Sequence, residues 1–322
     1  MCCVTMSAGL RPLLLAASTN PTLRRELTHR RWPRDLALRF VAGETLEDGL
    51  SAARRLAAQG KAVTLDYLGE SVTQEHEARR AAEVVLATLS RLSGEGLPAG
   101  VSVKPTQMGL GLPGDPDGRL CRELLRTIAV EAERRRAHVT LDMEDSTVTE
   151  QTVALVEDLI AEGHRNVGCA VQSYLRRTRA DVARLSAVGA SLRLCKGTYD
   201  EPSELAYTCA VEVDASFDDC AAALLADGTF PRIATHDHRL IARVKGHAAR
   251  LGVSPRDFEF QMLYGVRTPL QDALLRDGHR LRVYVPFGDQ WYPYFMRRLA
   301  ERPANLLFFL RALAGSGRSG RA

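Results

Sequence analysis

The chain has 322 residues, of which 45% are hydrophobic and 25% are charged, a balance that is normal for a globular enzyme with a sizeable core. The formal net charge of +4 is small. Because this charge is spread over arginine-rich helical segments and is not concentrated in one block, we do not expect nucleic acid as a partner.

The seven cysteines show no CxxC spacing, so we interpret them as reduced thiols of a cytoplasmic protein. No apolar stretch is long enough to span a bilayer; the run from Leu13 to Ala17 is far too short. Arginine-rich helices favour an anionic surface weakly, which adds peripheral contact with the inner face of the plasma membrane as an option.

Residues 1–60 are predicted to form an N-terminal helical segment that packs on the main domain. Its clearest part is an amphipathic stretch from Leu46 to Ala58, which follows a candidate helix cap at Thr45. Met1 and Met6 are alternative translation starts, and we favour Met6 because no charged leader or long apolar segment precedes it.

Eight short β-branched or apolar runs follow, with amphipathic helical patterns between them. The runs are residues 62–68, 101–105, 139–144, 167–172, 191–196, 232–236, 258–263 and 281–286. This regular alternation predicts a (β/α)8 barrel of the TIM type over residues 61–313, with a disordered tail over residues 314–322. A doubly wound open sheet is the alternative, although it normally uses fewer strands.

Polar or ionisable residues stand at the end of almost every predicted strand, where the active sites of such barrels collect. They are Asp66, Glu70, Lys104, Asp142, Gln172, Arg193, Lys196, Thr235, His236, Gln261 and Tyr284. Arg193 lies within the apolar run SLRLCK, and a buried guanidinium needs an electron-rich partner such as a carboxylate, a phosphate or a flavin.

The predicted helix after the last strand begins with aromatic residues and continues with arginines. At 3.6 residues per turn, Tyr294, Arg297 and Glu301 share one face, and Arg298 is adjacent to it. Two neighbouring guanidiniums beside tyrosines suit a small carboxylate, because each planar fork can bind two oxygens.

Three motifs suggest other chemistries. GLGLPG at residues 109–114 matches a dinucleotide-binding pattern, but it lies in a turn-rich loop and does not open a helix. His236 and His238 resemble the HxH of barrel metallohydrolases, yet too few further ligands are available and we expect no metal. Lys196 could form a Schiff base as in barrel aldolases, although the neighbouring Gly197 fits a phosphate-binding lysine better.

Together these segments resemble the proline dehydrogenase family, in its monofunctional bacterial form. The resemblance rests on LDYLGE, SVKPTQMGL, LDMEDS, VQSYLRRT, LRLCKGTY, ATHD, FEFQMLYG and VYVPFG…WYPYFMRRLAER. It implies an FAD-dependent enzyme that oxidises L-proline to Δ1-pyrroline-5-carboxylate by hydride transfer from proline C5 to flavin N5. It further implies that the electrons pass to a quinone; the oligomeric state stays open.

The resemblance also implies roles for particular residues. Asp142 and Arg193 would act in catalysis at the flavin. The substrate would be bound by Lys104, Arg297, Arg298, Tyr284, Tyr294, Leu263 and Glu70. FAD would be bound by Met143, Gln172, Arg193, Lys196, Gly197, Thr198, Thr235, His236 and Glu301. Two departures from the family pattern, Pro105 and Thr198, remove no reacting group. A metal-dependent barrel hydrolase, a barrel aldolase and a non-catalytic amino-acid-binding barrel remain the alternatives.

Overall fold

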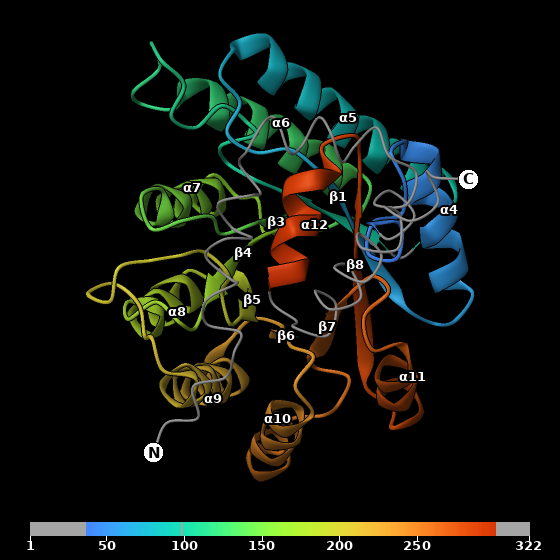
Figure 1. Ribbon diagram of the computed structural model, residues 1–322, viewed down its shortest axis with the longest axis vertical. Helices are drawn as coiled ribbons and strands as arrows, with labels where there is room; N and C mark the ends of the chain where they lie inside the picture. Colours follow the sequence, from blue (N-terminus) through green and yellow to red (C-terminus); the bar gives the residue numbers. More distant parts are fainter. Residues whose placement is uncertain (1–36, 98, 301–322) are drawn as a thin grey trace, which may run out of the picture.

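The computed structural model describes residues 37–97 and 99–300, and within them eight parallel strands close into a barrel in the order in which they follow along the chain (Figure 1). The strands are β1 (Ala62–Tyr67), β2 (Ala99–Val103), β3 (Val139–Leu141), β4 (Val167–Gln172), β5 (Ser191–Cys195), β6 (Arg232–Ala234), β7 (Glu259–Leu263) and β8 (Arg280–Phe287). Pairing of β1 with β8 closes the sheet. The predicted (β/α)8 barrel is confirmed, and the open-sheet alternative is wrong.

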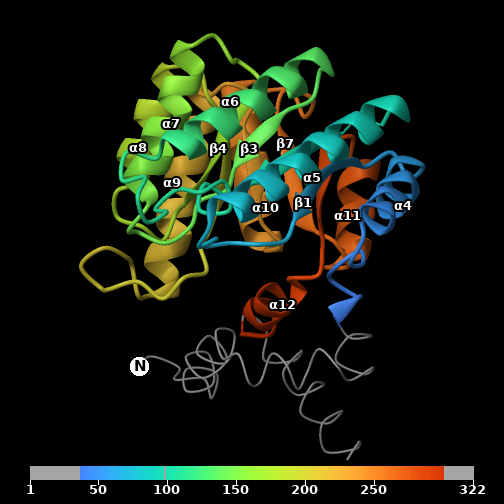
Figure 2. The ribbon, with the colours of Figure 1, turned by 90° about the horizontal axis from the view of Figure 1, so that it is seen from above.

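Helices surround this barrel and cover the outward side of its strands (Figures 1 and 2). They are α4 (Leu46–Ala57), α5 (Glu75–Gly94), α6 (Arg119–Arg134), α7 (Thr149–Ala161), α8 (Thr178–Ala187), α9 (Ala210–Asp227), α10 (His238–Leu251) and α11 (Thr268–Arg276). A further helix, α12 (Trp291–Ala300), follows β8. No helix of the described part of the chain has the length and apolar character needed to cross a membrane.

Helix α4 begins where the sequence predicted. The hydroxyl of Thr45 accepts a hydrogen bond from the Asp48 backbone N–H (3.2 Å), and the Asp48 carboxylate accepts one from the Thr45 N–H (3.0 Å). This reciprocal capping box satisfies two N–H groups that the first turn leaves unpaired. The apolar face of α4 packs on β1 and β8, so the last part of the predicted N-terminal segment lies against the barrel.

The strands divide their side chains between two environments, because alternate residues of a strand point to opposite faces. On β5, Leu192 and Leu194 are fully buried in the apolar layer between barrel and helices. Arg193 lies between them and points into the barrel, where it contacts side chains from β2 and β7. The interior of the barrel is therefore largely polar, and the apolar core is the layer around it.

Helix α12 does not join the outer ring. It lies across the end of the barrel at which the strands terminate, as the central position of α12 in Figure 1 and its place beyond the strands in Figure 2 show. Its aromatic residues, among them Trp291, Tyr292 and Phe295, are buried in a cluster of their own together with Leu68 and Val266 from the strand-end loops. This packing holds the arginines at the end of α12 over the C-terminal mouth of the barrel.

Candidate active site

Asp142, immediately after β3, is the centre of the hydrogen-bond network at the C-terminal mouth. Its Oδ1 accepts hydrogen bonds from Arg193 Nη1 (2.6 Å) and Ser102 Oγ (2.8 Å). Its Oδ2 accepts one from the Tyr284 hydroxyl (2.7 Å). Burial by itself raises the pKa of Asp142, but the nearby Arg193 and Lys104 outweigh burial and lower it, so the carboxylate stays ionised.

Lys104 projects from the end of β2 between two carboxylates. Its ammonium lies 3.1 Å from Asp66 Oδ1 and 3.5 Å from Asp142 Oδ2. Burial lowers the pKa of Lys104, and the charges of Asp66, Asp142 and Glu70 outweigh that effect and raise it. Asp66 is fully buried, and burial raises its pKa against the opposing effect of Lys104. Lys104 therefore remains a cation at the floor of the mouth.

Arg193 has most of its donors committed inside the barrel. Besides Asp142, it donates through Nε to Gln261 Oε1 (2.7 Å) and through Nη1 to Ser102 (2.9 Å). Its guanidinium carbon lies 5.2 Å from the centre of the Tyr284 ring. The remaining nitrogen, Nη2, is buried and has no hydrogen-bond partner among the described residues. A buried donor of this kind is costly unless a ligand satisfies it.

Two arginines near the end of α12 face the mouth from above. Arg297 Nη1 forms an ion pair with Glu70 Oε1 at 2.6 Å, and Glu70 lies in the loop after β1. Burial opposes the charge of Arg297, but Glu70 outweighs it and raises the pKa of this arginine. The guanidinium of Arg298 lies 5.2 Å from the ring centre of the buried Tyr294. The tyrosine and the two arginines that the helical spacing grouped together thus lie near one another.

The described residues that are implied for FAD lie at the same end of the barrel, within or just after β3 to β6. Gln172 is buried and donates to the Glu144 carbonyl (2.9 Å). Lys196 forms ion pairs with Asp214 (2.5 Å) and Asp237 (3.5 Å). These are local contacts of the protein, and they position the side chains just beyond the strand ends.

Gly197 follows Lys196 with a backbone φ of +106°, a conformation that favours glycine. A Cβ added there would lie 2.1 Å from the ring of Tyr174, so any other residue would displace the ring or the loop. The next strand end contributes His236, whose Nε2 accepts a hydrogen bond from the Leu263 backbone N–H (2.9 Å). Because that bond uses the Nε2 lone pair, the nitrogen is not available to a metal.

The other predicted site residues have these positions. Met143 and Thr235 are buried, and Thr235 Oγ1 accepts from the Asp237 N–H (3.1 Å). Leu263 and Thr198 are partly exposed. Glu301 lies outside the described residues, as do residues 1–36 and the predicted tail. Within the described ranges no group of three His, Cys, Asp or Glu side chains is arranged to hold a metal ion.

Comparison with known proteins identifies the family. The family model described as proline dehydrogenase matches residues 49–311, which is most of the chain. The chain belongs to the proline dehydrogenase family. It is 36% identical over 285 residues to Proline dehydrogenase 2 of Bacillus subtilis (strain 168), with 88% of this chain and 92% of that protein covered. It is 35% identical over 305 residues to the proline dehydrogenase of Deinococcus radiodurans, with 94% and 97% covered.

A solved structure agrees with this assignment. The proline utilization A protein (PutA) of Bdellovibrio bacteriovorus, inactivated by N-propargylglycine, matches with a TM-score of 0.80 and 25% sequence identity. The match covers 90% of this chain and 36% of that longer chain. The family membership and the enzyme class predicted from the sequence, a proline dehydrogenase, are confirmed.

The structure adds residues to which the sequence assigned no role. Asp66 was recognised only as a strand-end carboxylate, and it proves to be a partner of Lys104. Ser102 stands two residues before Lys104 on the same face of β2, so strand alternation could have found it. Tyr199, at the end of the LRLCKGTY motif, is close enough to Glu70 and Arg297 to contribute to the raised pKa of that arginine.

Proposed function

We propose that this proline dehydrogenase oxidises L-proline to Δ1-pyrroline-5-carboxylate with FAD as its cofactor. One observation carries the proposal. Three cations that could bind a carboxylate lie at the mouth of the barrel, and near them a buried arginine has one N–H donor without a hydrogen-bond partner among the described residues. Arg297, Arg298 and Lys104 supply the cations, and Arg193 supplies the donor, Nη2.

The proline carboxylate is the group that the two arginines of α12 select. Arg297 is held in place by Glu70, and Arg298 is held against Tyr294, so both guanidinium planes are fixed before the substrate arrives. A fixed bidentate donor loses less entropy on binding than a mobile one. Lys104, the third cation, is balanced by Asp66 and Asp142, and this prevents an uncompensated positive charge at the floor of the mouth.

The donor set fits a flavin. An isoalloxazine offers carbonyl oxygens and ring nitrogens that accept hydrogen bonds, and Arg193 Nη2 is a buried donor without a partner among the described residues. Gln172 and Lys196 add polar groups at adjoining strand ends. Gly197 has no side chain, so the backbone there can lie close to a ligand. FAD, when bound, supplies the two-electron acceptor that no side chain of this chain provides.

The protein's own task is to orient proline and to exclude water and larger amino acids. Tyr284, Tyr294 and Leu263 provide the apolar wall beside the cations, and the Tyr284 hydroxyl is fixed by its bond to Asp142. The ring nitrogen must lose its proton before C5 can release a hydride, so turnover should rise with pH across the neutral to alkaline range. Burial, Asp142 and Asp66 raise the pKa of Tyr284 well above its ordinary value, so this hydroxyl stays protonated in that range.

We further propose that the electrons leave to a quinone, at the inner face of the plasma membrane, from a cytoplasmic enzyme. The quinone is proposed because a reduced FAD must pass two electrons to an acceptor. The location is supported by cysteines that form no disulfide within the described residues. These free thiols are Cys121, Cys169, Cys195, Cys209 and Cys220.

The decisive experiment is an absorption spectrum of the purified protein, before and after anaerobic addition of L-proline. We expect flavin bands that bleach with L-proline, whereas an equal concentration of L-valine leaves them unchanged. A flavin that ignores L-proline would reject the substrate, and a protein that stays colourless with added FAD would reject the cofactor. Arg193→Ala should lose FAD or be reduced much more slowly, whereas Arg184→Ala, a surface arginine paired with Glu157, should behave as wild type.

A further inference from the structure

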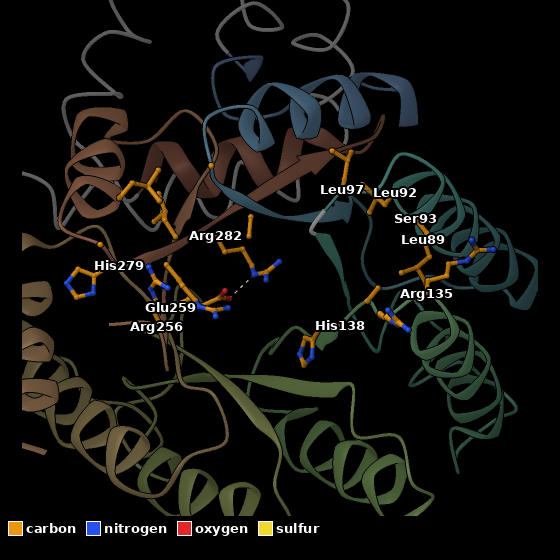
Figure 3. Close-up of a pocket in the computed structure, with 18 residues that line it drawn as sticks. Leu89, Leu92, Ser93, Leu97, Arg135, His138, Arg256, Glu259, His279 and Arg282 are labelled. Atoms are coloured by element: carbon orange, nitrogen blue, oxygen red, sulfur yellow. Dashed lines mark hydrogen bonds and ion pairs between the residues drawn. The ribbon is translucent and has the colours of Figure 1, made fainter. Parts of the chain in front are cut away.

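A cavity of about 590 Å³ opens at the other end of the barrel, where the strands begin (Figure 3). We call it the basal cavity. Its wall is formed by residues just before or at the start of β1, β3, β7 and β8, together with the C-terminal parts of α5 and α6. It is separate from the candidate active site, because none of the site residues described above lines it. Its size lies within the range of small-molecule sites, roughly 300–1,000 Å³.

The charges around the basal cavity do not balance. The arginines that line it are Arg135, Arg136, Arg256, Arg280 and Arg282, and Glu259 is the single acidic residue of the lining. Arg135 is paired with Glu131, and Arg282 with Glu259. For Arg136, Arg256 and Arg280 the described residues provide no carboxylate within 4.0 Å, which leaves an excess of three guanidiniums around one cavity.

Positive charge is also in excess among the residues that lie behind the lining of the basal cavity. Glu259 Oε1 is shared by Arg282 Nε (2.7 Å) and the buried Arg232 Nε (3.7 Å), so one carboxylate serves two guanidiniums. Burial lowers the pKa of Arg232 to about 9; Glu259 opposes the shift, whereas Arg282 and Arg193 add to it. The His138 ring also lines the cavity, and Figure 3 shows it facing the same space as Arg282. Arg136, Arg256 and Arg280 are exposed to solvent at the opening of the cavity, whereas Arg232 is buried behind it. An anion in the cavity would compensate the exposed guanidiniums directly and the buried one through the electric field.

One of these three arginines, Arg136, has a backbone conformation in which glycine would be more stable. Arg136 follows the end of α6 with a backbone φ of +53°, in the left-handed region where glycine is favoured. Keeping a non-glycine residue there costs stability. If only the backbone conformation mattered, glycine would be the best residue at this position. A role in binding a ligand explains why an arginine is present.

The lining of the cavity also has an apolar part. Leu97, which follows α5, and Leu275 of α11 are partly exposed and contribute this surface; Leu89 and Leu92 of α5 also line the cavity but are buried. In Figure 3 these leucines of α5 and its loop lie across from Glu259 and His279, with Arg282 between the two sides. A simple inorganic anion would use only the arginines, whereas an organic anion would also cover the partly exposed Leu97 and Leu275.

We propose that the basal cavity is a binding site for a small organic phosphate, whose phosphate is held by Arg136, Arg256 and Arg280 and whose organic part covers Leu97 and Leu275. Arginine forks match phosphate oxygens in pairs, and the net charge of the lining is opposite to that of the ligand. The site lies at the end of the barrel remote from the candidate active site, so it goes beyond the proposed function and does not depend on it.

Isothermal titration calorimetry of the FAD-saturated protein tests the proposal, with phenyl phosphate and inorganic phosphate as probes in a chloride buffer. Saturating FAD keeps the probes from the cofactor site. We expect saturable binding of phenyl phosphate with a Kd below about 1 mM, and binding of inorganic phosphate at least about threefold weaker. Absence of saturable phenyl phosphate binding up to 10 mM (roughly −2.7 kcal/mol) overturns the site. Equal affinities for both probes overturn the organic phosphate as ligand class.

Variants locate the binding. The triple change Arg136→Gln, Arg256→Gln and Arg280→Gln should weaken phenyl phosphate binding by about tenfold or more. The triple change Arg119→Gln, Arg179→Gln and Arg243→Gln removes the same charge from exposed positions elsewhere, and should leave the affinity unchanged. If the first triple variant binds within about threefold of wild type, the site is refuted.

A single variant guards against misfolding as an explanation. Arg136→Gly should raise the melting temperature, because glycine suits the left-handed backbone, and should still weaken phenyl phosphate binding. Weaker binding by a more stable protein supports the site. Unchanged binding in this variant removes Arg136 from it and contradicts the proposal.

Discussion

Arg193 and Asp142 form an ion pair of 2.6 Å across the interior of the barrel, joining β5 to the end of β3. The pair is one step of a longer hydrogen-bonded series. Arg193 donates to Gln261 Oε1 (2.7 Å), and Gln261 Nε2 donates to Glu259 Oε1 (2.6 Å). Polar contacts therefore connect the C-terminal mouth with the base of the barrel, and a change at either member of the ion pair should affect both folding and the flavin site.

Asp142→Asn tests the ion pair. The amide keeps the size of the side chain but leaves Arg193 and Lys104 without the charge that compensates them. Removing one partner of a buried pair typically costs about 3–5 kcal/mol, so we expect a loss of about 3 kcal/mol in the free energy of unfolding and a large loss of proline oxidation. Urea denaturation measures the first. Ser102→Ala removes the hydroxyl that donates to Asp142 and accepts from Arg193 but leaves the ion pair in place, so it should cost less, about 1.5 kcal/mol. Equal costs for the two variants would contradict the assignment.

Arg298→Lys tests the carboxylate clamp. A lysine keeps the positive charge but lacks the planar fork and its stacking on Tyr294. We expect the KM for L-proline to rise by about tenfold or more, with the flavin spectrum unchanged, because Arg298 is not among the residues expected to bind FAD. Steady-state kinetics give the answer. Arg184→Lys is the matched surface control and should leave KM unchanged; an unaltered KM in Arg298→Lys would remove this arginine from the clamp.

The sequence was sufficient for the fold because the barrel repeats one signal eight times. Each predicted run contains or overlaps an observed strand, and the predicted helix from Leu46 to Ala58 differs from α4 by one residue. The largest boundary difference is at β3, which ends at Leu141 although the run was predicted to continue to Glu144. Asp142 still donates its N–H to the Val103 carbonyl of β2 (2.8 Å), and the chain leaves the sheet after it. Apolar character alone does not show where the pairing stops.

The sequence was less informative about partners. It predicted that Arg193 needs an electron-rich neighbour, but spacing could not distinguish Asp142 from a flavin, since a flavin would also be bound at the strand ends. It also gave no indication of the basal cavity, because the charged residues there are far apart in the chain. Arg232, Glu259 and Arg282 stand at strand starts, and they meet only when the sheet closes.

Gly197→Ala tests whether the loop after β5 can accommodate a side chain at this position. The backbone φ of +106° disfavours any side chain, and the added Cβ would meet the Tyr174 ring at 2.1 Å. Strain and overlap together should cost about 2–4 kcal/mol of unfolding free energy and weaken FAD retention. Gly111→Ala is the control: its φ is +82° but nothing lies within 4 Å, so it should cost only about 1 kcal/mol. Thermal unfolding and the flavin content after gel filtration would show the difference, and equal effects would argue against a packing role for Gly197.

His138→Gln tests the surplus charge at the base of the barrel through the pH dependence of stability. Burial, followed by the charges of Arg232, Arg282 and Arg193, lowers the pKa of His138 well below its ordinary value of 6.5. The unfolded chain therefore binds this proton more readily than the folded protein. The free energy of unfolding keeps the full contribution of the neutral His138 above about pH 6.5, and this contribution should fall by about 1.4 kcal/mol for each pH unit below it, until the pKa of the folded protein is reached.

His138→Gln should remove this contribution to the pH dependence of the unfolding free energy, measured by urea denaturation between pH 5 and 6.5. The measurement requires a buffer without multivalent anions, because an anion in the basal cavity would favour the protonated ring. His238→Gln, at an exposed position on α10, should retain the wild-type slope, and an identical slope in all three proteins would show that His138 is not held neutral by its surroundings.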